Sequence, residues 1–248
     1  MHRVLQFTEH RPFPVPDLPW IMRQRWDDVL FLHWPVPPDV IRPHIPDEVE
    51  LDLYDGTAWL GIVLFEVNGL RGRFLPPFPF TSTFPEVNVR TYVKKNGKPG
   101  VYFFSLDTTN KLAIKAARTG YSLPYFFADV SLDRSSTDVN FRSIRKERGL
   151  PRETLHVNYQ PTGEGIPNEE GSFQHWMAER YCLWSLFGDD LFRTDLHHRK
   201  WALESVNVEL TSNTMAQFVP REFLNRVPKA HYSVTKNALF WLPVKEEN

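Results

Sequence analysis

One stretch decides the fold class of this sequence: Thr57-Ala-Trp-Leu-Gly-Ile-Val-Leu-Phe-Glu-Val67. Side chains along a β-strand point alternately to its two faces, so Trp59, Val63 and Phe65 share one face while the residues between them share the other. Both sets are almost entirely apolar, and a strand with two apolar faces is buried on both sides. We therefore expect a β-strand in the interior, with packed material on either side of it.

Short apolar runs before and after this stretch predict a mainly β (β-rich α+β) fold. The further strands are expected at residues 29–34, 86–93, 101–106, 125–132, 139–145, 153–160, 181–187, 191–198, 203–210 and 232–242. Short helices are expected at residues 39–45, 110–119, 173–178 and 212–218, the second with Asn110 as its N-cap and Gly120 at its end. So many short strands favour an antiparallel barrel or two packed sheets, because either leaves few strand edges bare.

Two segments are marked by proline and glycine. The prolines of residues 1–19 exclude a helix or a central strand, so we expect an extended N-terminal arm. Between the strands at 86–93 and 101–106, Asn96-Gly97 can supply the positive φ angles of a tight reversal. The distance from this pair to Pro99-Gly100 nevertheless indicates a longer loop.

The chain is expected to form a single domain over residues 1–248. It shows no internal repeat and no low-complexity linker, and residues 161–171 are the most linker-like stretch if there are two domains. The sequence has no run apolar and long enough to span a membrane, and its N-terminus lacks the apolar core of a signal peptide. Together with the single cysteine, Cys182, these features predict a cytoplasmic protein.

The charge balance limits the kinds of partner. Basic and acidic residues number 29 and 30, so no overall field attracts nucleic acid or an anionic membrane surface. A small neutral or singly charged ligand fits this balance better. The glycine-rich nucleotide loops, the G-x-S-x-G elbow and the H-E-x-x-H helix are all absent from the sequence, so we expect no cofactor. No metal is expected either, because the adjacent His197 and His198 point to opposite faces of a strand.

Two other groups have a functional and a structural interpretation. Cys182 is either a nucleophile with a histidine such as His175 nearby or a small core residue of an apolar strand, and the structural interpretation is favoured. Lys94, Lys95 and Lys98 either bind phosphate or are solvated at a loop tip, which is again favoured.

Three blocks resemble the YqjF-like family of largely uncharacterised bacterial proteins. They are Trp26-Asp-Asp-Val-Leu-Phe-Leu-His-Trp34-Pro, Asp55-Gly-Thr-Ala-Trp59-Leu-Gly, and Glu179-Arg-Tyr-Cys-Leu-Trp184 followed by His197-His198. Their order and spacing match over nearly the whole chain. That family is similar in fold to acetoacetate decarboxylase, which implies an antiparallel β-barrel or cone that encloses an interior cavity, with a few short helices. Shared fold does not by itself imply shared activity.

The stretch from Ala117 to Phe126 resembles the signature of the decarboxylase without its reactive part. Arg118 and Pro124 keep the spacing of the arginine and proline in that signature, but Tyr125 and Phe126 stand where it has two lysines. The resemblance implies that one of those lysines condenses with a substrate ketone, which a phenol cannot do. Lys111 and Lys115 share a helix face and are an alternative source of an amine, although helix-surface lysines are usually solvated.

The resemblance implies an interior carboxylate at Glu86, from the segment Phe84-Pro-Glu-Val87. Arg118 is then its partner or a clamp for a ligand carboxylate, and the structural alternative is an ion pair that closes the barrel. Tyr125 either donates a hydrogen bond to a ligand or packs in the barrel wall. His33 and His198 are further ligand-binding candidates, or else core histidines.

Two functions remain open from the sequence. The first is a small-molecule-binding protein or enzyme that holds a carboxylate or carbonyl compound in the barrel cavity, between aromatic walls such as Phe103 and Phe127, without Schiff-base lysine catalysis. The second is a non-catalytic structural or interaction protein whose barrel is filled by its own side chains. A homo-oligomer is compatible with either function.

Overall fold

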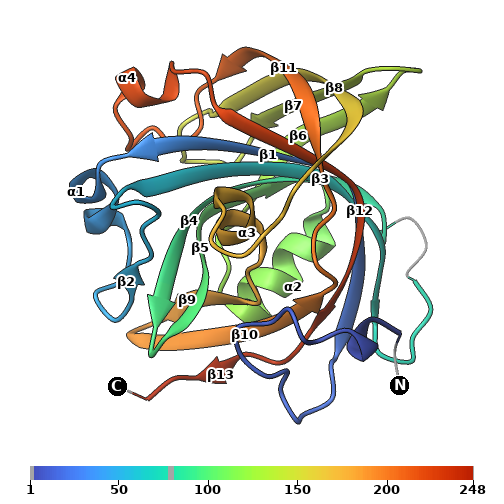
Figure 1. Ribbon diagram of the computed structural model, residues 1–248, viewed down its shortest axis with the longest axis vertical. Coiled ribbons are helices and arrows are strands. Elements are labelled where there is room, and N and C mark those ends of the chain that lie inside the picture. The colour runs from blue at the N-terminus through green and yellow to red at the C-terminus, as the bar shows by residue number, and fades with distance from the viewer. Residues whose placement is uncertain (1–2, 78–80, 248) are drawn as a thin grey trace.

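The computed structural model describes residues 3–77 and 81–247, and its strands form one sheet that curves back on itself (Figure 1). The strands are β1 (Met22–Val36), β2 (Glu50–Leu51), β3 (Ala58–Gly72), β4 (Phe84–Lys95), β5 (Lys98–Thr108), β6 (Tyr125–Arg134), β7 (Val139–Arg145), β8 (Thr154–Ile166), β9 (Cys182–Phe187), β10 (Asp190–His198), β11 (Leu203–Asn213), β12 (Lys229–Phe240) and β13 (Val244–Lys245). The helices are α1 (Pro38–Ile41), α2 (Lys111–Tyr121), α3 (Phe173–Ala178) and α4 (Arg221–Leu224), with 3-10 turns η1 (Arg3–Gln6) and η2 (Arg42–His44). The mainly β fold expected from the sequence is confirmed.

The strand order explains how the sheet closes. It runs β13-β10-β9-β5-β6-β7-β8-β11-β12-β1-β3-β4-β2, and two additional pairings, β4 with β5 and β10 with β12, join strands that are far apart in this order. The sheet is therefore ring-like. The pairing is mostly antiparallel, as expected, but β5 pairs in parallel with both β6 and β9. Helix α2 makes the crossover that connects the parallel neighbours β5 and β6.

The interior contains two apolar regions, and β1 and β3 have a face in each. On β1, Leu30 and Leu32 belong to the first region while Val29 and Phe31 belong to the second. All side chains from residue 58 to residue 65 of β3 are buried, so the prediction of a strand covered on both faces is confirmed. The first region also receives side chains from β6, β7 and β8, and the second receives side chains from β5, β9 and α3.

The hairpin between β4 and β5 is tighter than the sequence indicated. Lys95 pairs with Lys98, so Asn96 and Gly97 form the whole turn. Their φ angles are +50° and +72°, as a two-residue type I′ turn requires. The expectation of a longer loop is wrong because the ladder includes Pro99, which lies opposite Lys94.

Two other segments differ from expectation. Residues 212–218 are not a helix, because β11 continues to Asn213 and α4 begins only at Arg221. The first half of the linker-like stretch 161–171 lies in β8, where it pairs with β11, so this stretch does not separate two units of structure.

Helix α2 begins as the sequence indicated. The side-chain oxygen of Asn110 accepts hydrogen bonds from the backbone N–H groups of Leu112 and Ala113, at 3.1 and 3.0 Å. The helix continues past Gly120 to Tyr121, and the next residue, Ser122, adopts the left-handed conformation with φ +50°. Among the helices of the described residues, none combines the length and the apolar composition that crossing a membrane would need.

The N-terminal segment lies against β10 and is extended only in part. Residues 3–6 form the 3-10 turn η1, whereas the described residues from 7 to 21 contain no helix or strand. The backbone oxygen of Val4 lies 3.0 Å from His197 Nε2, and Arg11 Nη1 donates to the backbone oxygen of Leu196 at 2.7 Å. These contacts fasten the segment to β10.

Candidate functional site

An interior cavity of about 180 Å³ lies in the second apolar region, between the sheet and helix α2. At ~30 Å³ for each water molecule of the liquid, this is the space of roughly six waters. Its apolar wall consists mainly of aromatic side chains from the strands and of small side chains from α2: Phe31, Phe65, Phe84, Phe103, Ala113, Ala117, Trp201 and Phe240. The expected wall residue Phe103 is among them. Such a cavity suits a small, largely apolar molecule.

Strand β4 provides a row of polar side chains to this cavity. Glu86, Asn88 and Arg90 alternate along the strand and all three line the cavity, as period-two side-chain direction requires. Asn88 is buried, and its Oδ1 has no hydrogen-bond partner among the described residues. A buried polar atom without a partner is uncommon in folded proteins, so Asn88 marks a position where a ligand atom or water would be stabilised.

Glu86 and Tyr125 form a hydrogen-bonded pair in the cavity wall. The Tyr125 hydroxyl donates to Glu86 Oε2 at 2.8 Å, and Glu86 is only 4 % exposed. Burial raises the pKa of Glu86 to about 7, against the lowering effect of the hydrogen bond from Tyr125, and the nearby Asp107 raises it further. Burial and the adjacent Glu86 also hold the pKa of Tyr125 well above its usual value. Near neutral pH the pair therefore carries a proton that it can hold or give up.

Arg90 brings a positive charge to the cavity. Its Nη2 donates to the Tyr92 hydroxyl at 3.3 Å, and its guanidinium lies 5.7 Å from the ring centre of Phe31. Its Nε is buried without a hydrogen-bond partner, and among the described residues Arg90 forms no ion pair with a carboxylate. The charge of Arg90 is thus not balanced by a neighbouring side chain.

Arg180 is a second arginine in the cavity wall, and it is 5 % exposed. Its Nη1 is paired with the carboxylate of Asp52, and its Nε donates to the backbone oxygen of Trp176 at 2.5 Å. Its Nη2 has no partner among the described residues. Burial lowers the pKa of Arg180, an effect that Asp52 opposes. Arg90 and Arg180 have one carboxylate partner between them, so the part of the cavity wall that they form carries a net positive charge.

His198 lines the cavity, as expected, but its ring is held by the backbone. Its Nδ1 lies 2.9 Å from the carbonyl oxygen of Arg199, and its Nε2 lies 3.3 Å from that of Arg180. Burial keeps the pKa of His198 well below its usual value. Thr194 on the same strand also lines the cavity, and its hydroxyl has no partner among the described residues.

His33 lies behind the cavity rather than in its wall. Its Nε2 is 2.5 Å from the hydroxyl of Tyr92, the same hydroxyl that accepts from Arg90. Burial lowers the pKa of His33 well below its usual value, so the ring is neutral. Gly61 permits this packing, because a Cβ there would come within 3.1 Å of His33 Nε2. His33 therefore contacts the site through Tyr92 and Arg90.

Arg118 does not pair with Glu86, so the expected interior ion pair is wrong. Its Nε donates to the backbone oxygen of Tyr125 at 2.7 Å, and its Nη2 lies 3.1 Å from Glu147 Oε1. The side chain is 42 % exposed. The physical reason is the orientation of α2: Ala113 and Ala117 face the cavity, and Arg118 projects from the outer side of the last turn.

Lysine is not among the described residues that line the cavity. Lys115 is exposed, and the Lys111 ammonium lies over the ring of Phe127, 4.7 Å from its centre. Phe127 is not among the described residues that line the cavity, so the expectation that it forms part of the cavity wall is wrong. Cys182 is fully buried, and burial raises the pKa of its thiol to about 12, which agrees with a core role. In residues 3–77 and 81–247, no three His, Cys, Asp or Glu side chains gather as metal ligands would.

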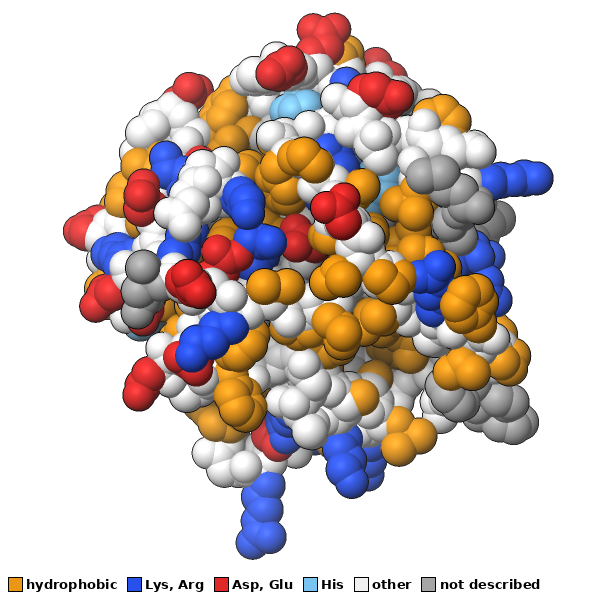
Figure 2. Space-filling model, turned by 90° about the horizontal axis from the view of Figure 1, so that it is seen from below, with side chains coloured by type: hydrophobic (Ala, Val, Ile, Leu, Met, Phe, Trp, Pro, Cys, Tyr) orange, Lys and Arg blue, Asp and Glu red, His pale blue; other side chains and the backbone are white. Residues whose placement is uncertain are grey.

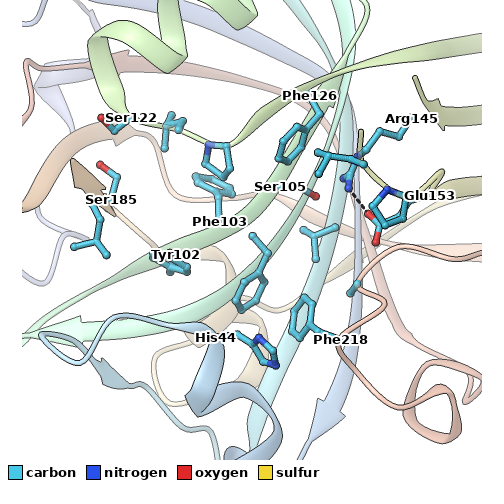
Figure 3. A pocket seen from close by; sticks show the side chains of 18 of the residues that line it. His44, Tyr102, Phe103, Ser105, Ser122, Phe126, Arg145, Glu153, Ser185 and Phe218 are labelled. Atoms are coloured by element: carbon cyan, nitrogen blue, oxygen red, sulfur yellow. Dashed lines mark ion pairs between the residues drawn. The ribbon is translucent and has the colours of Figure 1, made fainter. Parts of the chain in front are cut away.

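A larger pocket of about 430 Å³ lies beside β5 and contains its own charge compensation (Figure 3). Phe103 lines this pocket as well as the interior cavity. Arg145, the one arginine among the described residues that line this pocket, pairs with Glu153 at 2.6 Å and with Asp107 at 2.7 Å. Because Arg145 already has two carboxylate partners, this pocket offers less to an anionic ligand than the interior cavity does.

The chain belongs to the DUF2071 family, described as an uncharacterized conserved protein, which matches residues 23–236. Among its relatives is the uncharacterized protein YqjF of Bacillus subtilis (strain 168). The two are 39 % identical over 233 residues, which cover 94 % of this chain and 96 % of YqjF. The resemblance to YqjF-like proteins is thereby confirmed.

Solved structures of similar fold include acetoacetate decarboxylase and an enzyme of enduracididine biosynthesis. An acetoacetate decarboxylase-like enzyme from Sphingomonas wittichii RW1 matches with TM-score 0.63 and 13 % identity, over 96 % of this chain and 98 % of its own. Acetoacetate decarboxylase from Legionella pneumophila gives the same TM-score and identity, over 95 % and 93 %. The enduracididine biosynthesis enzyme MppR complexed with pyruvate matches with TM-score 0.61 and 11 % identity, over 94 % and 92 %. At these identities the likeness establishes the fold alone.

Proposed function

We propose that the interior cavity binds a small carboxylate with a short apolar body, and that no lysine forms an imine with it. The observation that carries this proposal is the pair of cavity-lining arginines, Arg90 and Arg180: Asp52 pairs with Arg180, and Arg90 has no carboxylate partner among the described residues. A carboxylate accepts two parallel hydrogen bonds from a guanidinium, and it would balance the second charge. The aromatic wall accommodates the rest of the molecule.

The opposite end of the polar row suits a carbonyl or hydroxyl oxygen. Glu86 and Arg90 are four residues apart on β4, which separates their Cα atoms by about 13 Å at the rise of a strand. A ligand held by Arg90 would thus extend toward the Glu86–Tyr125 pair. Because Tyr125 donates to Oε2, a proton on the other oxygen of Glu86 is available to a ligand carbonyl. This arrangement supports a reaction in which a hydrogen bond from Glu86 polarises the ligand carbonyl and no covalent bond to the protein forms.

The small size of the cavity limits the ligand. Pockets for drug-sized molecules have volumes of roughly 300–1,000 Å³, and this cavity has about 180 Å³. Hexanoate is a suitable probe, and hexanamide is its neutral counterpart of the same shape. In a thermal-shift titration we expect hexanoate to raise the Tm of the full-length protein and hexanamide to have little effect, because only the acid is charged.

The variant Arg90→Gln tests the proposed contact, and Arg152→Gln is its control. Residue 152 is an exposed arginine outside the cavity, so the control changes the net charge equally. We expect Arg90→Gln to lose the response to hexanoate and the control to keep it. Equal responses to hexanoate and hexanamide would show that the charge is not recognised. No response to either probe, together with no retained metabolite in native mass spectrometry, would favour the non-catalytic structural protein.

A further inference from the structure

A separate groove lies on the outer surface, where the N-terminal segment meets the start of β1 and the middle of β12. Its volume is about 970 Å³, within the range of small-molecule sites, roughly 300–1,000 Å³. Five of its lining residues are basic: Arg3, Arg23, Arg199, Lys200 and Lys236. None of the described residues that line it is acidic, although acidic residues slightly outnumber basic ones in the chain. Figure 2 shows Lys and Arg side chains gathered on the right of the face seen from below, without Asp or Glu among them.

These basic side chains have contacts, but none with a carboxylate within ion-pair distance among the described residues. Arg23 Nη2 donates to Asn237 Oδ1 at 2.9 Å. The Arg199 guanidinium lies 3.7 Å from the ring centre of Phe7. Elsewhere on this protein arginines such as Arg134 and Arg145 pair with acidic residues, whereas the charges of the groove have no such partner among the described residues.

Lys236 is the buried member of this set. Its side chain is on β12, the residue is 8 % exposed, and its Nζ donates to the backbone oxygen of Lys200 at 2.8 Å. The ammonium also lies 4.8 Å from the ring centre of Trp201. Burial lowers its pKa to about 8, against a raising effect of the more distant Glu179. A buried cation without an adjacent counter-charge is costly, and an anion bound in the groove would offset that cost.

We propose that this groove binds a small phosphate-bearing anion, with its oxygens between Arg23, Arg199 and Lys236. One phosphate group carries close to two negative charges and three acceptor oxygens, so it compensates several cations where a single carboxylate cannot. Guanidinium groups and a lysine ammonium are the side chains that bind phosphate most often. The near-zero net charge of the chain argues for a small ligand over a nucleic acid, which requires a longer basic stripe.

Isothermal titration calorimetry on the full-length protein, in about 0.15 M salt to screen weak surface charge, tests the proposal. The probes are sodium tripolyphosphate, ATP and citrate, the last of which carries several carboxylates and no phosphate. We expect tripolyphosphate to bind with one-to-one stoichiometry and citrate to bind at least about tenfold more weakly. Tighter binding of ATP would identify a nucleotide as the ligand, and equal binding would identify the phosphate chain alone.

Two variants localise the site. Arg199→Gln changes an exposed residue and should leave the fold intact, whereas Lys236→Met replaces the buried ammonium with an uncharged side chain of similar length. Each should raise the Kd for tripolyphosphate about tenfold or more, because each removes one charge-assisted hydrogen bond. Arg152→Gln is the matched control, since it removes an exposed positive charge outside the groove, and its Kd should stay within about twofold of the original.

Three results would overturn the proposal. They are the absence of tripolyphosphate binding to the unaltered protein, binding of citrate as tight as that of tripolyphosphate, and an equal loss of affinity in Arg199→Gln and the Arg152→Gln control. None of these measurements depends on the interior cavity, so the outcome is independent of the function proposed there.

Discussion

Glu86 makes the stability of the protein depend on pH in an unusual direction. Burial raises its pKa from 4.5 to about 7, so between these values the folded protein holds a proton that the unfolded chain has lost. Stability therefore falls as the pH rises through this window, and the loss is complete above it. For most carboxylates, which are stabilised as ions in the folded state, the dependence has the opposite sign.

The replacement Glu86→Gln removes the titrating group and keeps an acceptor for Tyr125. We expect the free energy of unfolding of this variant to exceed that of the original protein by an amount that grows from pH 5 to pH 8. It should level off at a few kcal/mol, since each pKa unit corresponds to about 1.4 kcal/mol. Urea unfolding at a series of pH values measures this difference.

Glu147→Gln is the control of opposite sign. A hydrogen bond from the Phe127 backbone N–H lowers the pKa of Glu147, and Arg118 lowers it further, so its ionised form stabilises the fold. The Glu147→Gln variant should be less stable than the original protein at pH 8. A Glu86→Gln variant that is also less stable than the original protein at pH 8 would contradict the raised pKa of Glu86, because it would show that the ionised carboxyl stabilises the fold.

The candidate site was only partly predictable from the sequence, and the reasons differ by residue. Glu86 and Tyr125 were expected from a family resemblance, and the structure brings them within 2.8 Å. Asn88 and Arg90 were missed, although their alternation with Glu86 along one strand was a usable signal. Arg180 carried no such signal, because its partner Asp52 is 128 residues away in the chain.

The turn between β4 and β5 has a conformational requirement that a single substitution can test. Gly97 has φ +72°, and no atom outside its chain neighbours lies within 4 Å of a Cβ built there, so a side chain would meet backbone strain and no clash. We expect Gly97→Ala to lower the free energy of unfolding by roughly 1–2 kcal/mol, the cost of the left-handed conformation for other residues.

Gly120→Ala is the matched control within the same chain. Gly120 also has open space around a built Cβ, but it lies inside α2 and its φ is not in the left-handed region. Alanine there should raise the free energy of unfolding by about 0.5–1 kcal/mol, because alanine is the better helix former. Chemical denaturation of both variants measures the two effects, and a loss of stability at Gly120 equal to that at Gly97 would refute the role of φ.

The sequence predicted an element where the side-chain pattern within one segment was sufficient. It did not predict the bounds or direction of a strand where these depend on pairing with a strand distant in the chain. The strand around residues 57–67 and helix α2 followed from side-chain patterns within one segment. The extension of β11 to Asn213 depends instead on its pairing with β8, from Leu203 opposite Ile166 to Asn213 opposite Leu155. The parallel pairing of β5 with β6 and β9 likewise depends on closure of the whole sheet.

At the scale of the molecule, the ring-like sheet surrounds an interior cavity that no lysine among the described residues lines. Two apolar regions share the strands β1, β3 and β4, and only the second contains the cavity with Glu86, Arg90 and Arg180. The fold is shared with acetoacetate decarboxylases, but at 13 % identity the chemistry has to be judged from the residues that line this cavity.

The lack of a lysine among the described cavity-lining residues gives a prediction for the whole protein. Incubation with acetoacetate and borohydride should leave its mass unchanged, because an imine requires an amine that the carbonyl can reach. The double variant Tyr125→Lys/Glu86→Gln is the positive control: it places an amine in the cavity, where burial lowers its pKa, and removes the carboxylate that would keep it charged. Intact mass spectrometry should detect a reduced adduct on this variant alone. An adduct on the original protein, mapped by peptide digestion to any lysine, would contradict the proposal that this cavity binds its ligand without an imine.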